Sequence, residues 1–151
     1  MDHASKTILL VEDNPDDEKL TLRAFKRHHM LNPIDVVRDG VDALDYLFAR
    51  GTYAGRVGKA VPALIVPDLK TPRLGGLEVL KGIRANERTK LIPVVVMTSS
   101  QEEQDRIQSY SLGANSYLHK PIDFAEFVEA VRVLGVYWLM MNQPPPECSP
   151  S

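Results

Sequence analysis

The sequence has little cysteine and no long apolar stretch. Cys148 is the only cysteine among 151 residues, so an intrachain disulfide and a cluster of thiolate metal ligands are both excluded. No uninterrupted apolar run approaches the length that crosses a bilayer, and residues 1–6 lack the apolar centre of a signal peptide. We therefore expect a cytoplasmic protein with no membrane partner.

A strong excess of one charge is also missing. The formal net charge is −2, which gives no indication of nucleic acid as a partner. The hydrophobic fraction of 44% is enough for the core of one domain, and 151 residues leave little for a second. We expect a single domain over residues 1–141 and a disordered tail at residues 142–151, which are rich in proline and serine.

Short apolar runs alternate with amphipathic stretches along the chain. The runs predict five strands, at residues 7–11, 34–37, 63–68, 94–97 and 115–119, with a helix after each. This alternation predicts an α/β fold with an open, doubly wound parallel sheet, helices on both faces and right-handed crossovers. Five such units are too few for an eight-stranded barrel.

Capping residues mark several of the expected helix ends. Asn14 and Pro15 are residue types favoured at the N-cap and at the first helical position, and Gly113 is expected to stop the fourth helix. Two pairs have capping-box spacing and predict the starts of the last two helices: Ser100 with Glu103, and Asp123 with Glu126. Residues 51–62 predict a long loop whose basic residues either contact a partner or are only solvated.

Polar residues stand where successive strands end. They are Glu12 and Asp13 after the first strand, Asp68 at the end of the third, Thr98 after the fourth and Lys120 after the fifth. The carboxyl ends of parallel strands meet at one edge of the sheet, where ligands bind in open α/β folds. Each residue alone also fits an ordinary role as a turn, cap or solvated residue, but the ordered combination is far more specific.

Clustered carboxylates repel one another, so this pattern predicts a cation among them. Mg²⁺ takes oxygen ligands and keeps several waters. We expect Asp13 and Asp68 as direct ligands, Glu12 acting through a water, and the backbone carbonyl of Lys70 completing the shell. A flavodoxin-like mononucleotide site is the structural rival, but residues 11–17 are acidic and lack a glycine-rich phosphate loop.

A metal beside Asp68 would let this carboxylate act as a nucleophile toward phosphorus. The cation neutralises the incoming phosphoryl oxygens, and aspartate is a known covalent nucleophile in phosphoryl transfer. Lys120 would place a positive charge beside one phosphoryl oxygen, and the Thr98 hydroxyl would donate a hydrogen bond to another.

Together these residues resemble the receiver domain of two-component response regulators. The resemblance covers about residues 5–139 and rests on the segments 8–14, 95–98 and 113–114, on Asp68 with Pro72 and Gly76, and on Tyr117 with Lys120-Pro121. It implies a flavodoxin-like sheet of strand order 2-1-3-4-5. It also implies that the protein is a phosphoacceptor signalling protein and not a metabolic enzyme.

The resemblance also implies roles for individual residues. Glu12 and Asp13 would form the acidic metal pocket, and Asp68 would take a phosphoryl group from the phosphohistidine of a sensor histidine kinase. Thr98 and Tyr117 would form the switch pair. Lys120 would contact the phosphate, and its bond to Pro121 would be cis.

Finer features are similar to those of single-domain regulators that partner phytochromes. They are the loop at 51–62, Arg38-Asp39-Gly40 at the start of the second helix, and an extended last helix carrying Tyr137-Trp138-Leu139. Three residues around Asp68 depart from the family pattern. Pro67 replaces an aliphatic residue and removes a ladder donor, Thr71 replaces a Met or Leu, and Lys70 is uncommon and could pair with the acidic cluster.

The last helix predicts an interface. Its inward stripe is Phe124, Phe127, Val128, Val131, Leu134 and Trp138, yet four further apolar residues fall largely outside it: Val133, Val136, Tyr137 and Met140. Exposed apolar patches of this kind mark interaction sites, so we predict a homodimer through this helix and its neighbours. Coverage by the proline-rich tail is the alternative.

Three functions remain open from the sequence. The first is a stand-alone response regulator that is phosphorylated on Asp68 and changes the surface of its fourth helix, fifth strand and fifth helix. The second is a phosphorylation-impaired receiver that acts as a binding module, favoured by Pro67 and Thr71. The third is a Mg²⁺-dependent phosphohydrolase. Lys70 argues against the third, because such enzymes usually carry a second acid at this position.

Overall fold

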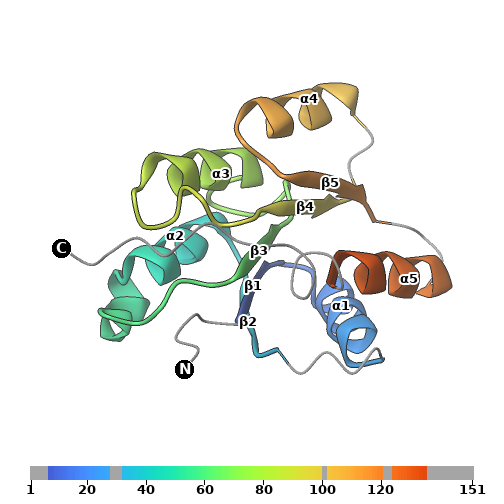
Figure 1. Ribbon diagram of the computed structural model, residues 1–151, viewed down its shortest axis with the longest axis horizontal. Coiled ribbons are helices and arrows are strands. Elements are labelled where there is room, and N and C mark those ends of the chain that lie inside the picture. The colour runs from blue at the N-terminus through green and yellow to red at the C-terminus, as the bar shows by residue number, and fades with distance from the viewer. Residues whose placement is uncertain (1–6, 28–31, 100–101, 121–123, 136–151) are drawn as a thin grey trace.

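The structure, a computed structural model, describes residues 7–27, 32–99, 102–120 and 124–135 (Figure 1). The strands are β1 (Ile8–Val11), β2 (Ile34–Val37), β3 (Leu64–Pro67), β4 (Val95–Thr98) and β5 (Ser116–His119). The helices are α1 (Pro15–Arg27), α2 (Gly40–Phe48), the 3-10 helix η1 (Gly51–Arg56), α3 (Gly76–Ala85), α4 (Glu103–Ser111) and α5 (Phe124–Gly135). The predicted alternation of strands and helices is confirmed.

All paired strands run parallel. β1 lies between β2 and β3, with Ile8 in register with Ile34 and Leu64. β4 pairs with β5, and the two groups meet at a bridge between Ile65 and Val94. The strand order is therefore 2-1-3-4-5, as the sequence predicts.

Helices cover both faces of the sheet. α1 packs against α5 on one face, and α2 packs against α3 on the other (Figure 1). Because successive strand residues point to opposite faces, Leu9 and Val11 join the core on the α2 side. Ile8 and Leu10 join the core on the α1 side. This two-sided burial explains why the central strands have uninterrupted apolar sequences.

Pro67 interrupts the hydrogen bonding between β3 and β4. The N–H of Asp68 donates to the Val11 carbonyl of β1 (3.1 Å), whereas the N–H of Ile65 donates to the Pro93 carbonyl on the β4 side (3.0 Å). Since N–H groups along a strand alternate between its two neighbours, position 67 faces β4, where proline has no N–H to donate. The ladder between β3 and β4 is therefore reduced to the bridge at Ile65.

The start of α1 follows the predicted capping pattern. The Asn14 side-chain oxygen accepts hydrogen bonds from the N–H groups of Asp16 (2.9 Å) and Asp17 (3.1 Å). These bonds satisfy two donors that the first helical turn leaves unpaired. The first turn of α1 thus begins directly beyond the carboxyl end of β1, which matters for the site described below.

Two local predictions are wrong. α4 begins at Glu103 with Glu102 as its N-cap, and Glu102 makes no side-chain capping bond, so Glu103 cannot serve as the third residue of a capping box with Ser100. Residues 51–62 are not wholly a loop, because η1 forms there. The Arg56 guanidinium lies 3.7 Å from the centroid of the Tyr46 ring, and this contact fastens η1 to α2.

Several predictions fall on residues outside the described ranges. They are the capping residue Asp123, the cis bond at Pro121, the extension of the last helix through residues 136–141, and the tail at residues 142–151. No helix within the described part of the chain is long and apolar enough to span a membrane.

Candidate functional site

Asp68 lies directly after β3, and its carboxylate is held on both oxygens. Oδ1 accepts a hydrogen bond from the backbone N–H of Lys70 (3.1 Å), and Oδ2 accepts one from Lys120 Nζ (2.8 Å). Only 8% of the residue is exposed. A carboxylate that is fixed in direction and largely shielded from water is placed to react with one approaching group.

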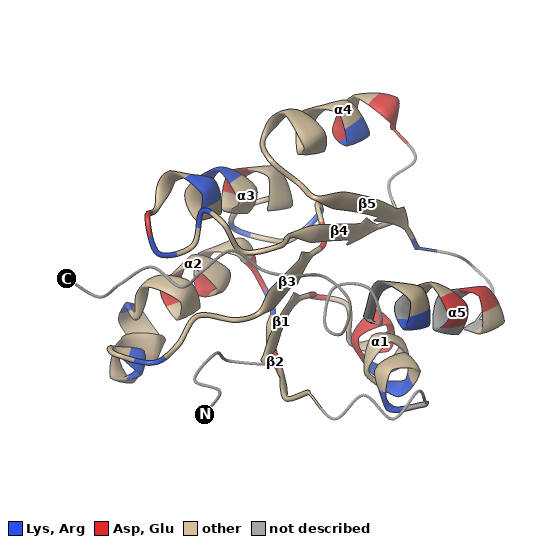
Figure 2. Cartoon of the chain, in the orientation of Figure 1, with Lys and Arg blue, Asp and Glu red and all other residues tan. Residues whose placement is uncertain are grey.

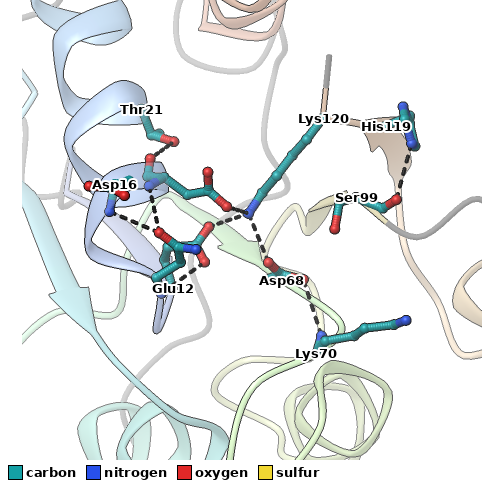
Figure 3. Close-up of polar contacts among 10 residues, drawn as sticks. Glu12, Asp16, Thr21, Asp68, Lys70, Ser99, His119 and Lys120 are labelled. Carbon is teal, nitrogen blue, oxygen red and sulfur yellow. Dashed lines mark hydrogen bonds and ion pairs between the residues drawn. The ribbon is translucent and has the colours of Figure 1, made fainter. Parts of the chain in front are cut away.

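Lys120 joins three carboxylates from two other parts of the chain (Figure 3). Its Nζ donates to Glu12 Oε1, to Asp17 Oδ2 (3.0 Å) and to Asp68 Oδ2 (2.8 Å). An ammonium group has three N–H donors, so these contacts use its full capacity. The Lys120 backbone N–H also donates to the Thr98 carbonyl (2.8 Å), which fixes the start of the segment after β5 beside the end of β4.

Asp17 is a site residue that the sequence prediction missed. It lies in the first turn of α1, where acidic residues are already explained by the helix dipole. Its position in the sequence nevertheless indicated that it lies near Asp68. An N-cap at Asn14 begins the helix at the carboxyl end of β1, so first-turn side chains lie at the same edge of the sheet as Asp68. Acidic residues gather at this end of α1 (Figure 2).

Burial and charge act in opposite directions in this cluster. Burial raises the pKa of Glu12 to about 7, although the hydrogen bond and charge of Lys120 lower it. Burial lowers the pKa of Lys120, but the hydrogen bonds that it donates to Asp68 and Glu12 outweigh burial and raise the pKa above its ordinary value. Lys120 therefore keeps its charge, and one cation faces several acids. The site has an excess of negative charge and attracts a further cation.

The remaining predicted residues lie around this cluster. Thr98 is fully buried at the end of β4, and Asp13 is exposed next to Glu12. Tyr117 of β5 is partly buried and packs against the core on the α2 side. The structure thus brings Glu12 and Asp68 each into direct contact with Lys120 and places Thr98 and Asp13 adjacent to them in the chain or the sheet.

The donor atoms at this edge are suited to a hard cation. Carboxylates of Asp13 and Asp68 and a backbone carbonyl are oxygen ligands, which Mg²⁺ and Mn²⁺ accept. Among the described residues, no group of three His, Cys, Asp or Glu side chains is arranged to hold a metal ion. The Lys120 ammonium group instead lies between the carboxylates of Glu12, Asp17 and Asp68.

The segment after Asp68 is a closed turn. The Thr71 hydroxyl donates to the Leu74 carbonyl (2.7 Å), and the Gly76 N–H donates to the Leu69 carbonyl (3.0 Å). Thr71, a departure from the family pattern, therefore shapes the turn. The Lys70 side chain is directed away from the acidic cluster (Figure 3), so only its backbone N–H contacts Asp68.

Comparison with known proteins identifies the class. The family model of the response regulator receiver domain matches residues 8–132. The chain belongs to this family, so it is a two-component signalling protein, and it is related to the phytochrome response regulators.

Individual relatives agree with this class. The probable methanogenesis regulatory protein FilR2 of Methanothrix harundinacea is 42% identical over 138 residues, which are 91% of this chain and 86% of FilR2. Response regulator Rcp1 of Synechocystis is 37% identical over 134 residues, 89% of each chain. Its Mn²⁺-bound structure has a TM-score of 0.84 and covers 93% of this chain and 99% of Rcp1. The phosphorylated cyanobacterial phytochrome response regulator RcpA has a TM-score of 0.86 at 36% identity, covering 95% of this chain and all (100%) of RcpA.

Proposed function

We propose that Asp68 accepts a phosphoryl group from the phosphohistidine of a sensor histidine kinase. The observation that carries this proposal is the shielded Asp68 carboxylate held 2.8 Å from Lys120 Nζ at the carboxyl end of β3. An Asp68 oxygen forms a bond to phosphorus while the phosphorus–nitrogen bond to the kinase imidazole breaks. The departing nitrogen keeps the bonding electron pair and takes a proton from solvent.

Residues of this chain stabilise the charge that accumulates in this step. Lys120 is released from Asp68 Oδ2 as that carboxylate becomes an acyl phosphate, and it then donates to a phosphoryl oxygen. Thr98 donates its hydroxyl to a second oxygen. Asp13, Asp68 and the Lys70 carbonyl would hold Mg²⁺ directly, with Glu12 acting through a water. When bound, the metal neutralises phosphoryl charge.

The switch would operate through Thr98 and Tyr117. Phosphorylation adds roughly −1.5 to −2 charges at Asp68. Movement of the Thr98 hydroxyl toward these charges vacates space into which Tyr117 rotates, and the surface of α4, β5 and α5 changes. A bias of a few kcal/mol between the two arrangements is sufficient for such a switch.

The partners follow from relatives and from surface chemistry. Because RcpA is described as a phytochrome response regulator, a phytochrome-type kinase is the proposed donor. We take residues 1–141 as a single domain. Val133 of α5 is 53% exposed, and an exposed apolar side chain there supports a homodimer through α5. Val136, Tyr137 and Met140 of the predicted patch lie outside the described residues. Light scattering at tens of micromolar that finds only monomer would remove the dimer proposal.

A phosphorylation-impaired receiver that acts as a binding module is the second candidate. The missing hydrogen bond at Pro67, directly before the acceptor, is the observation that favours it. The two candidates differ in one measurable property, which is whether Asp68 takes up a phosphoryl group from a small-molecule donor.

Labelling with acetyl phosphate tests the proposal. The intact protein is incubated with the donor in Mg²⁺ or in a chelator, and mass spectrometry counts the phosphoryl groups added. We expect one group in Mg²⁺, little in chelator, and none on Asp68→Asn. Undiminished labelling of Asp68→Asn would exclude Asp68, and an unlabelled wild type would favour the binding module.

A further inference from the structure

The turn that follows Asp68 is tied to the start of α2. The Arg73 guanidinium donates from Nε to Asp39 Oδ2 (2.7 Å) and from one terminal nitrogen to Asp39 Oδ1 (3.0 Å) and Asp42 Oδ1 (3.0 Å). Asp39 is also the N-cap of α2, since its side chain accepts from the Asp42 N–H (2.8 Å). One guanidinium therefore contacts two acids at the start of α2.

The backbones of the two segments also approach closely. The Gly40 N–H points to the Pro72 carbonyl (3.4 Å). A Cβ added to Gly40 would lie 2.0 Å from the Leu74 carbonyl oxygen, so only glycine permits this approach. The ion pairs of Arg73 and the packing at Gly40 are independent contacts that join the same two segments.

Arg73 occupies a conformation that it would not adopt by itself. Its φ is 63°, in the left-handed region that residues with a Cβ disfavour. Such a backbone persists only where surrounding contacts enforce it. The bidentate pair with Asp39 supplies that enforcement, because a planar guanidinium fits a carboxylate in one orientation.

The turn transmits its position to the acceptor. The Lys70 N–H that holds Asp68 Oδ1 belongs to this turn. At the other end of the turn, a Cβ on Gly76 would lie 2.5 Å from the Asp68 carbonyl oxygen, so the start of α3 packs directly on the acceptor's backbone. Neither Arg73 nor Asp39 contacts Asp68, Glu12 or Lys120 through any hydrogen bond or ion pair found in the described residues.

We propose that Arg73 is a positioning residue for the phosphorylation of Asp68. It holds the turn that follows Asp68 against Asp39 and Asp42 of α2 and so controls the rate of phosphorylation. The proposal rests on the proposed function of Asp68 as the phosphoryl acceptor. Misplacing a reacting group by about 1 Å lowers rates up to roughly 100-fold. Loosening this turn is expected to slow labelling of Asp68 about tenfold.

The test compares labelling rates of the wild type and five variants with acetyl phosphate in Mg²⁺. Arg73→Ala removes both ion pairs. Asp39→Asn keeps an N-cap side chain but removes the charge that Arg73 contacts. Arg73→Lys keeps the charge without the planar fork, and the double variant Arg73→Ala/Asp39→Asn completes a double-mutant cycle. The matched control is Arg50→Ala, because Arg50 is 57% exposed, like Arg73 at 55%, and pairs with Asp45 at the other end of α2.

We expect labelling about tenfold slower in Arg73→Ala and Asp39→Asn, no further loss in the double variant, partial recovery in Arg73→Lys and no change in Arg50→Ala. Thermal unfolding checks that the variants are folded. If Arg73→Ala labels at the wild-type rate, or if the two single effects add in the double variant, the proposal is wrong.

Hydrogen exchange separates this inference from the proposed function. The amide hydrogens of Leu74 and Gly76 are bonded within the turn, so their exchange reports its order whether or not Asp68 is phosphorylated. We expect faster exchange of both in Arg73→Ala than in Arg50→Ala. Unchanged exchange would refute the clamp, whereas an unlabelled wild type with the expected exchange would refute only the function of Asp68.

Discussion

The burial of Glu12 predicts that ionisation of its carboxylate lowers the stability of this protein. Burial raises the pKa of Glu12 from 4.5 to about 7. Between these values the folded protein binds more protons than the unfolded chain, so stability falls as pH rises through this window. At 1.36 kcal/mol per pKa unit, ionised Glu12 costs up to about 3 kcal/mol above pH 7.

Glu12→Gln should remove this cost. Glutamine keeps an oxygen that accepts from Lys120 but cannot ionise, so the free energy of unfolding of the variant relative to wild type should rise by up to about 3 kcal/mol from pH 4.5 to pH 8. Urea unfolding in the presence of a chelator measures this difference at each pH. Taking the difference between variant and wild type cancels the titration of histidines that both proteins share.

Glu87→Gln is the matched control, because the Glu87 side chain is 85% exposed and pairs with Lys90 at 2.9 Å. Its stability relative to wild type should not change across the same window. Parallel pH curves for Glu12→Gln and wild type would refute the reasoning, since they would mean that Glu12 titrates equally in the folded and unfolded states.

Three further predictions follow from contacts outside the acidic cluster. Arg84→Met should lower the free energy of unfolding by about 3 kcal/mol, measured by thermal or urea unfolding. The half-buried Arg84 guanidinium donates to the carbonyls of Gly113 (2.7 Å), Lys90 (2.8 Å) and Ile92 (2.8 Å), and methionine leaves them unpaired. A loss of stability smaller than that of Arg50→Ala would contradict this prediction. Gly40→Ala should cost about 1–3 kcal/mol in the same assay, because the added Cβ meets the neighbouring turn. Pro67→Val should stabilise by about 1 kcal/mol by restoring a ladder N–H, and equal stability would show that this bond does not form.

The sequence predicted the positions of the strands because their burial on both faces leaves a clear apolar pattern. It also predicted that Glu12, Asp68 and Lys120 would lie together, because each follows a strand in a parallel sheet. These inferences depend only on chain order and on the geometry common to all parallel sheets.

Other features depend on contacts between distant residues and could not be predicted in this way. The start of α4 is not set by the Ser100/Glu103 spacing, since local capping signals do not determine where tertiary packing begins a helix. Asp17 was explained by the helix dipole alone, and Arg73, between Pro72 and Leu74, belongs to no motif in the sequence. Its role becomes visible only when Asp39, thirty-four residues earlier, lies within 2.7 Å.

Because Pro67 has no N–H to donate, the sheet has few backbone hydrogen bonds between β3 and β4. On one side of this boundary lies β3, which leads to Asp68. On the other side lie β4, which ends at Thr98, and β5, which contains Tyr117 and leads to Lys120. Sliding the β4–β5 pair past β3 breaks fewer backbone hydrogen bonds than it would in an unbroken ladder. A rearrangement of β4 and β5 in response to the proposed phosphorylation of Asp68 would therefore meet less resistance from the backbone.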